Sequence, residues 1–166
     1  QKVEKKVPKI PDLNELSEGV VKWFAKRGIS EATLDMAGVE SGEAFIGGER
    51  KNAIAFVHRD KDGKTINVKF RTRDKEFSQI KDGHRLPYLW NMVSTDQPHL
   101  IINEGEVDAL TCLEAGLSNV ISVPDGASDK KLNWIDELNG ELNGFKRIVL
   151  LTDGDSVGIA MRNELA

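Results

Sequence analysis

The stretch "HLIINEGEVDALTCLEAGLSNVISV", residues 99–123, contains the pattern that decides the fold. Apolar runs of strand length open and close this stretch, and a segment of helical length lies between them. The alternation continues with three further predicted elements, a helix over 129–139, a strand over 147–152 and a helix over 156–166. Strands that alternate with helices indicate a parallel sheet with right-handed crossovers. We therefore predict an α/β fold in which helices flank a parallel sheet.

The chain before this pattern predicts a small α+β subdomain. Ser17 and Ser30 each precede a short amphipathic segment and are suited to cap a helix, so we expect a helical hairpin. The alternating segments "AIAFVHRD" and "TINVKFRTRD" flank Asp62-Gly63, a strong signal for a tight turn, which predicts a β-hairpin.

These patterns divide the chain into three regions. Residues 1–16 are charged, contain Pro8 and Pro11 and lack periodicity, so we predict a linker or tail there. Residues 17–96 form the predicted α+β subdomain, which is basic in part, and residues 97–166 form the predicted parallel-sheet domain.

Composition limits the classes of protein that fit. The 166 residues, 39% of them hydrophobic, are enough to bury a core. We expect no membrane association, because no run of about 18 or more apolar residues is present, and the lack of an export signal makes the cytoplasm the expected location. Cys112 is the single cysteine, which excludes an internal disulfide and a cysteine-rich zinc module. The net charge of −4 still permits a local basic patch.

Acidic side chains follow two of the predicted strands at the point where each strand ends. Glu104 follows the strand over 99–103, and Asp153 and Asp155 follow the strand over 147–152. In open α/β sheets the functional crevice lies beyond the carboxyl ends of the strands. If the two strands are neighbours, three carboxylates converge, and their mutual repulsion favours a bound Mg²⁺ or Mn²⁺. The alternative is that these are solvated loop acids favoured by the dipoles of the following helices.

A second charged segment, "INVKFRTRDK" at 66–75, alternates apolar and basic residues. This period of two places the apolar side chains on one face of a strand and the basic ones on the other, namely Lys69, Arg71 and Arg73, with Lys75 close behind. A cationic face of this kind suits the phosphates of nucleotides and nucleic acids. The alternative is an ordinary strand with one solvated face.

Two other features carry weaker signals. The segment "DGASD" at 125–129 lies between a strand and a helix, where Gly126 and backbone N–H groups favour an anion such as a nucleotide phosphate. A simple turn explains this segment equally well. Trp23, Trp90 and Trp134 are able to stack on bases, but their apolar surroundings favour packing in the core.

The acidic motifs and the basic segment together resemble a known family. "EGEVDAL" at 104–110 and "TDGDSVG" at 152–158 resemble the paired acidic motifs of the TOPRIM domain, which topoisomerases and some nucleases share. "NVISVPDGASD" is similar to the central loop of bacteriophage and organellar primase-helicases. "KRGISEATLDMAGVE" at 26–40 and "VKFRTRDKEF" at 68–77 resemble the helical opening and the basic strand of the RNA-polymerase region of these primases. The resemblance covers residues 17–166.

The resemblance implies a TOPRIM-like sheet and the synthesis of short RNA primers on single-stranded DNA from ribonucleoside triphosphates during DNA replication. It makes three acids the catalytic metal ligands, Glu104, Asp153 and Asp155, and adds Asp108 as a further acid of the first motif. The resemblance assigns the nucleotide and DNA contacts to the basic strand, and it assigns catalytic contacts to Lys69 and Lys75. The expected metal is Mg²⁺ or Mn²⁺, and the expected setting is a bacterial or phage-infected cell, with an organellar matrix as the alternative.

The chain departs from this family in two ways. A single cysteine is unable to build the zinc-binding module that selects the template in these primases, and the sequence stops at "RNELA" inside the last predicted helix. We therefore expect a C-terminally truncated fragment of a protein that also carries a zinc-binding module and a ring helicase. Two alternative functions stay open at this point. The first is strand cleavage by a TOPRIM nuclease or topoisomerase; a topoisomerase needs a nucleophilic tyrosine, and Tyr88 is the one tyrosine of the sequence. The second is a non-catalytic DNA-binding or assembly module.

Overall fold

The computed structural model describes residues 7–126 and 132–166. The chain divides into two compact units, Gln1–His84 and Arg85–Ala166. This division falls earlier in the chain than the domain boundary expected at residue 96. The reason is that the segment after His84 joins the second unit, where the Tyr88 backbone N–H donates to the Ser122 carbonyl at 3.0 Å.

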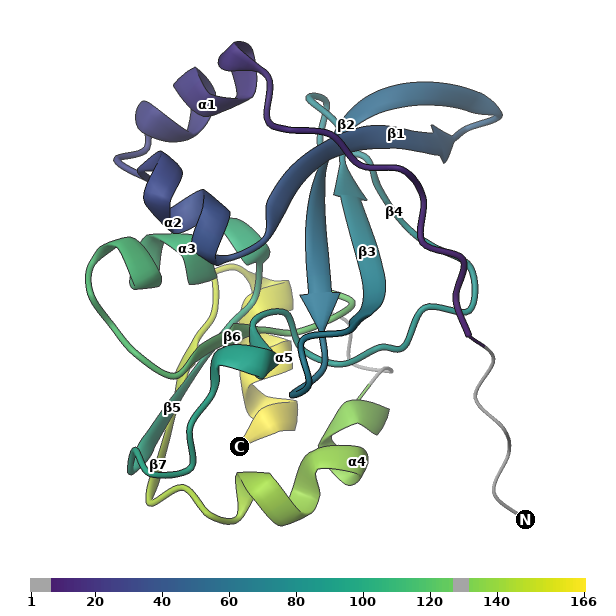
Figure 1. The fold of residues 1–166 in the computed structure, drawn as a ribbon. Helices are drawn as coiled ribbons and strands as arrows, with labels where there is room; N and C mark the ends of the chain where they lie inside the picture. The colour runs from purple at the N-terminus through teal and green to yellow at the C-terminus, as the bar shows by residue number, and fades with distance from the viewer. Residues whose placement is uncertain (1–6, 127–131) are drawn as a thin grey trace. The chain divides into compact units, whose positions relative to one another are not determined.

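The first unit opens with the predicted helical hairpin, α1 (Glu18–Ala25) and α2 (Glu31–Met36) (Figure 1). Ser17 and Ser30 cap these helices as the sequence predicts. Each hydroxyl accepts the backbone N–H of the third residue of its helix at 3.4 Å. Phe24 on α1 is fully buried, so the helix is fixed by its apolar face as well as by its cap.

A four-stranded antiparallel sheet in the order β1-β2-β3-β4 follows the helices. Its strands are β1 (Val39–Ile46), β2 (Glu49–Arg59), β3 (Thr65–Arg71) and β4 (Phe77–Gln79). The pairing of β2 with β3 confirms the predicted hairpin. The sequence did not predict β1, which pairs with β2 in a long curved ribbon (Figure 1) and turns at Gly47 and Gly48, both with positive φ.

The central strands of this sheet are buried on both faces. On one face, alanines of β1 and β2 pack with Val68 and Phe70 of β3 in a small apolar cluster. On the other face, Phe56 of β2 and Asn67 of β3 are also fully buried. A strand in this position has no solvated side, although its sequence alternates.

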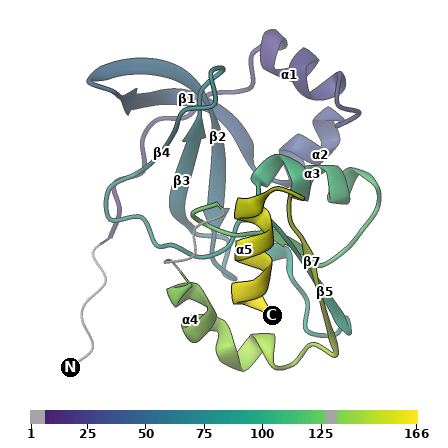
Figure 2. The same ribbon diagram turned by 180° about the vertical axis from the view of Figure 1, so that it is seen from behind.

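The second unit contains the predicted parallel sheet, with strand order β6-β5-β7. The strands are β5 (His99–Asn103), β6 (Val120–Ser122) and β7 (Arg147–Leu151). The helices are α3 (Glu106–Glu114), α4 (Asn133–Leu142) and α5 (Ser156–Leu165), with a short 3-10 helix, η1 (Trp90–Met92), before β5. Helix α3 packs against β5 and β6, and Figure 2 shows α5 beside β7.

This arrangement confirms the predicted α/β class, with a parallel sheet flanked by helices after a small α+β subdomain. The helix expected over 129–139 is described from Asn133 onward as α4, and the residues 127–131 lie outside the described structure. Within the described ranges, no helix combines the length and the apolar character needed to cross a membrane.

Candidate active site

Strands β5 and β7 are adjacent and parallel. This is the arrangement for which the sequence predicts that the acidic residues converge. They pair along their full length, from His99 with Arg147 to Asn103 with Leu151. Glu104 follows β5 directly, and the backbone N–H of Asp153 donates to Glu104 Oε2 at 3.1 Å. The structure therefore brings Glu104 and Asp153 together at the carboxyl edge of the sheet.

The first turns of two helices add the remaining acids to this edge. Asp108 lies in the first turn of α3, and a Cβ atom on Gly105 would lie 3.0 Å from Asp108 Oδ2. Asp155 caps α5, where its Oδ1 accepts the N–H groups of Val157 at 3.0 Å and Gly158 at 2.8 Å. Helix α5 thus fixes the position of Asp155 through its own backbone.

Gly158 permits the close approach of β5 and α5 at this edge. A Cβ atom at this position would lie 2.9 Å from Glu104 Oε2 and 2.9 Å from the Asp153 nitrogen, and closer still to the Asp153 carbonyl oxygen. Any side chain here would push the two acids apart. A glycine at position 158 is therefore required by the geometry of the acidic edge.

The acids at this edge repel one another. Burial raises the pKa of Glu104, and the charges of Asp153, Asp155 and Asp108 raise it further, against the opposing effect of the hydrogen bond from Asp153. Burial likewise raises the pKa of Asp108, and the Asp153 charge adds to the shift. Carboxylates that raise one another's pKa are typical of functional sites that bind cations or protons. We call Glu104, Asp108, Asp153 and Asp155 the acidic edge.

The donor chemistry of the acidic edge suits a hard divalent cation, because carboxylate oxygens are the ligands that Mg²⁺ and Mn²⁺ prefer. Among the residues that the structure describes, no group of three or more His, Cys, Asp or Glu side chains is arranged to hold a metal ion. Glu104 and Asp155 instead accept backbone N–H groups. Each of these hydrogen bonds engages one carboxylate oxygen, Glu104 Oε2 or Asp155 Oδ1, so it orients the side chain and is compatible with coordination of a cation by the other oxygen.

The basic residues of β3 do not form one solvated face. Lys69 is only 6% exposed, and its partners across the sheet are Phe56 on β2 and Gln79 on β4. Its Nζ lies 5.6 Å from the centroid of the Phe77 ring. The predicted outward-facing position is wrong for Lys69, because β3 is an inner strand that is buried on both sides.

The other predicted basic residues lie at or beyond the end of β3. Arg71 is half-buried, and its guanidinium carbon lies 4.9 Å from the centroid of the Trp23 ring. Arg73 and Lys75 are exposed on the turn that follows the strand. Lys75 has a φ of 62°, so this turn uses a left-handed residue to change direction.

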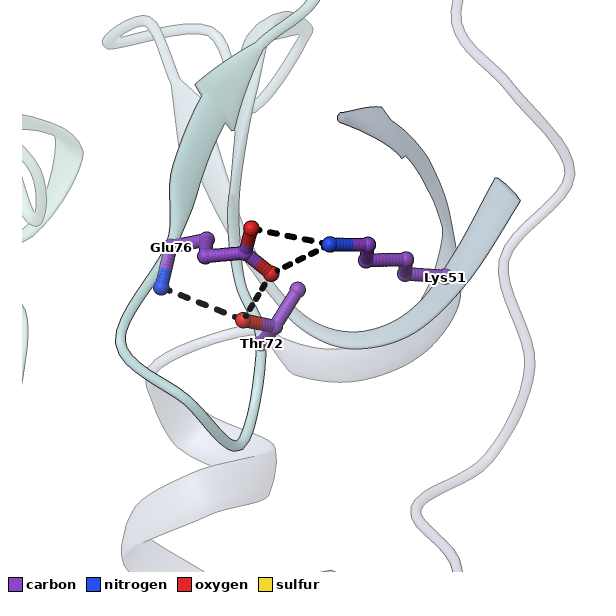
Figure 3. Close-up of polar contacts among 3 residues, drawn as sticks. All are labelled: Lys51, Thr72 and Glu76. Atoms are coloured by element: carbon purple, nitrogen blue, oxygen red, sulfur yellow. Dashed lines mark hydrogen bonds and ion pairs between the residues drawn. The ribbon is translucent and has the colours of Figure 1, made fainter. Parts of the chain in front are cut away.

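An ion pair that sequence reasoning missed ties this turn to β2 (Figure 3). Lys51 Nζ donates to both carboxylate oxygens of Glu76 at 2.8 Å. The Thr72 hydroxyl donates to Glu76 Oε2 at 3.3 Å and accepts the Glu76 backbone N–H at 3.1 Å. The partners are 25 positions apart, and no local spacing rule relates them. Lys51, Thr72 and Glu76 thereby hold both ends of the turn that carries Arg73 and Lys75. We call this turn, residues 72–76, the tied turn.

The remaining candidates are placed as follows. Gly126 has a φ of 70°, which favours glycine, but the anion-binding loop predicted around it continues into residues 127–131, outside the described structure. Trp90 and Trp134 are buried as expected, with 2% and 3% exposure. Trp23 is half-buried instead.

No protein-family model matches the sequence, but individual proteins do. The chain is 35% identical over 181 residues to the Twinkle homolog protein, chloroplastic/mitochondrial, of Arabidopsis thaliana, a match that covers 100% of the chain and 24% of that protein. It is 32% identical over 179 residues to the primase homolog protein of the same plant, with 99% of the chain and 51% of that protein covered.

A solved structure agrees with these relatives. The primase fragment of the bacteriophage T7 primase-helicase protein superposes with a TM-score of 0.70 and 26% identity, covering 98% of this chain and 68% of that one. The chain is thus similar in sequence to proteins named as primases and similar in fold to a primase fragment. This similarity confirms the resemblance drawn from the acidic motifs and the basic strand. The chain spans 24% and 51% of the lengths of the two plant proteins, so its relation to the primases concerns one region of each.

Proposed function

We propose that this chain is the core of a DNA primase, an RNA polymerase that makes short RNA primers on single-stranded DNA during replication. The observation that carries the proposal is the acidic edge: Glu104 and Asp153 are joined by a hydrogen bond, with Asp155 and Asp108 close enough to raise the pKa of Glu104. Similarity to proteins named as primases makes primer synthesis the reaction that we assign to this edge.

Each acid has a defined part in this proposal. Glu104, Asp153 and Asp155, with Asp108 beside them, would hold the metal ions. Mg²⁺ or Mn²⁺ bound there would supply activation of the attacking 3′-hydroxyl and neutralisation of charge on the α-phosphate. The chain itself contributes position: the Asp153 N–H orients Glu104, and the end of α5 holds Asp155.

The basic residues serve the phosphates of ribonucleoside triphosphates and of the template. Arg73 and Lys75 are exposed on the tied turn, so they are the residues suited to direct contact. Lys69 and Arg71 are more buried and add positive potential behind them. Gly126 contributes its permissive backbone to the central loop.

The proposal also concerns the rest of the protein. We expect a ring helicase elsewhere in the protein, because one neighbour in structure is a fragment of a protein named a primase-helicase. A zinc-binding module is expected from the family resemblance of the sequence motifs. The expected place of action is the cytoplasm of a bacterial or phage-infected cell. The plant relative named chloroplastic/mitochondrial supports an organelle as the alternative.

The test is a primer-synthesis assay with labelled ribonucleotides, single-stranded DNA and Mg²⁺ or Mn²⁺, performed beside a nicking assay on labelled DNA. Asp153→Asn should lower synthesis by about 100-fold or more, the loss typical when a charge-stabilising group is removed. Its circular dichroism spectrum should stay unchanged, because the substitution removes one repelling carboxylate. Asp96→Asn, in an exposed loop of the same unit, is the matched control.

Each outcome separates the candidate functions. Wild-type synthesis by Asp153→Asn would exclude the assigned role of the acidic edge. Nicking without primer synthesis would favour a TOPRIM nuclease or topoisomerase. Neither activity in the protein made from the full reading frame would favour a non-catalytic DNA-binding module.

A further inference from the structure

The last residue of β5, Asn103, is a buried amide at the end of an apolar run. The three residues before it are buried as well, namely Leu100, Ile101 and Ile102, and Asn103 itself is 1% exposed. Burying an amide costs free energy unless the amide is hydrogen-bonded, and an apolar side chain would fill the space without that cost. The amide at this position therefore indicates a role for its hydrogen bonds.

These hydrogen bonds connect Asn103 to two neighbouring elements. Its Nδ2 donates to the Ile121 carbonyl of β6 at 3.2 Å. Its Oδ1 accepts the S–H of Cys112 on α3 at 3.5 Å, a weaker bond because sulfur is a weak donor. The Asn103 backbone carbonyl also accepts the Val123 N–H at 3.1 Å. One buried residue thus connects the end of β5 to β6 and to α3, and a satisfied buried network of this kind favours a single geometry.

The connections reach two acids of the acidic edge. Glu104 is the residue directly after Asn103. Asp108 lies on α3 one helical turn before Cys112, on the same face of the helix. Burial raises the pKa of the Cys112 thiol, and the charge of Asp108 raises it further against the effect of the Asn103 bond, so the thiol is an S–H donor at neutral pH. Asn103 therefore lies where β5 delivers one acid and α3 the other.

Ser122 of β6 shows that burial at this edge does not by itself produce such a network. Ser122 pairs with Asn103 in the register of β5 and β6, and it is fully buried. Within the ranges that the structure describes, its hydroxyl has no hydrogen-bond partner. Two buried polar residues thus stand in register at this edge, and only the Asn103 side chain connects strand and helix. Ser122 serves as the matched control.

We propose that Asn103 is a positioning residue of the acidic edge, whose buried amide fixes Glu104 at the end of β5 relative to Asp108 on α3. It acts through these acids and is not itself a metal ligand. The inference rests on the proposed function in taking the acidic edge as the metal site. Residues that orient metal ligands from behind contribute about 10–100-fold to metal affinity. A purely structural residue would instead contribute to stability and leave metal affinity unchanged.

The first test needs no metal. The Asp153 N–H donates to Glu104 Oε2 at 3.1 Å, so its amide proton resonance in the ¹⁵N-correlated NMR spectrum reports on the position of Glu104. Asn103→Leu, which removes the hydrogen-bonding groups and keeps a side chain of similar size, should move this resonance upfield because the bond weakens. Ser122→Ala should leave it unchanged. An unchanged Asp153 resonance in Asn103→Leu would overturn the proposal.

The second test measures Mn²⁺ binding to the nucleotide-free protein by electron paramagnetic resonance of the free ion. Asn103→Leu should raise the dissociation constant by about 10-fold or more, and Ser122→Ala should keep the wild-type value. A lower melting temperature of Asn103→Leu with an unchanged Mn²⁺ constant would show that Asn103 supports only the fold, which would also overturn the proposal.

Cys112 offers a second pair of variants that disturbs the core less, because its side chain is half-buried. Cys112→Ala removes the donor to Asn103, whereas Cys112→Ser keeps a hydroxyl donor. Cys112→Ala should weaken Mn²⁺ binding by about 2–10-fold, the effect of one neutral hydrogen bond, and Cys112→Ser should restore part of it. Equal constants in these two variants would contradict the role of Asn103. Absence of Mn²⁺ binding in the wild type would count against the proposed function, whereas the Asp153 resonance would still decide this inference.

Discussion

The acidic edge of the second unit and the tied turn of the first are stabilised in opposite ways. At the acidic edge, burial and like charges raise the pKa of Glu104 and of Asp108. In the tied turn, the hydrogen bond with its partner lowers the pKa of Glu76 and raises the pKa of Lys51. None of the causes that shift the pKa of Glu104 is a positively charged side chain, whereas the charge of Glu76 is compensated by Lys51. The pKa changes therefore run in opposite directions in the proposed metal-binding site and in the structural ion pair.

The largest effect is expected from Gly158→Ala, which tests whether close approach defines the acidic edge. The added methyl group would collide with the Asp153 backbone and with Glu104 Oε2. Overpacking of this kind lowers the free energy of unfolding by about 1–3 kcal/mol, which urea denaturation would measure. Primer synthesis should fall with it, since the acids are displaced.

Gly154→Ala is the matched control for this change, because a Cβ atom there meets nothing within 4 Å. The control should retain the stability and the activity of the wild type. Equal unfolding curves for the two variants would mean that the acidic edge accommodates a methyl group at position 158. Close approach of α5 to Glu104 and Asp153 would then not distinguish the acidic edge from the tied turn.

A smaller effect is expected from pH, and its sign should differ between the two regions. The ordinary pKa of a glutamate is 4.5, and that of Glu76 is lower in the folded state, so Glu76 stabilises the fold above pH 4.5 and loses this effect as pH falls further. The folded-state pKa of Glu104 is higher than 4.5, so its stabilising effect is present below pH 4.5 and is lost as pH rises.

Melting temperatures of metal-free protein between pH 7 and pH 3 would reveal both signs. Relative to Glu104→Gln, the wild type should gain stability as pH falls. Relative to Glu76→Gln, it should lose stability over the lowest part of the range. If both differences move in the same direction, the two regions do not differ in the way described.

The smallest effect is expected from Lys75→Gly in the tied turn. Lys75 has a φ of 62°, a conformation that costs a residue with a side chain about 1 kcal/mol or slightly more and costs glycine little. The variant should be more stable by about 1 kcal/mol or less in urea denaturation. Lys64→Gly, at an exposed position where φ is not positive, should be less stable than the wild type. A loss of stability in Lys75→Gly would show that its side chain holds the turn.

The sequence was sufficient for the parallel sheet and for the acidic edge, because both depend on local patterns. Glu104 and Asp153 each follow an apolar strand, and parallel strands bring their carboxyl ends to one edge. The helix caps at Ser17 and Ser30 were also readable from their residue types. Roles for these acids in catalysis stay predictions.

The positions that sequence reasoning placed wrongly or missed depend on contacts distant in the chain. Lys69 is buried because strands on both sides enclose β3, and alternation within one strand carries no information on that. Strand β1 was missed because its glutamates interrupt the apolar pattern. The pair of Lys51 with Glu76 forms only when β2 and the tied turn meet. A pattern of period two describes one strand and says nothing about its neighbours.

The strand order β6-β5-β7 has a practical consequence for protein engineering. The two acid-bearing strands, β5 and β7, are held together by their own backbone pairing, whereas the chain reaches β7 from β6 through helix α4. A reporter domain or peptide tag inserted near Gly144, in the exposed link between α4 and β7, would therefore lengthen the crossover without shifting Glu104 relative to Asp153. The same link offers a site for attaching a fluorophore that leaves the register of the sheet unchanged.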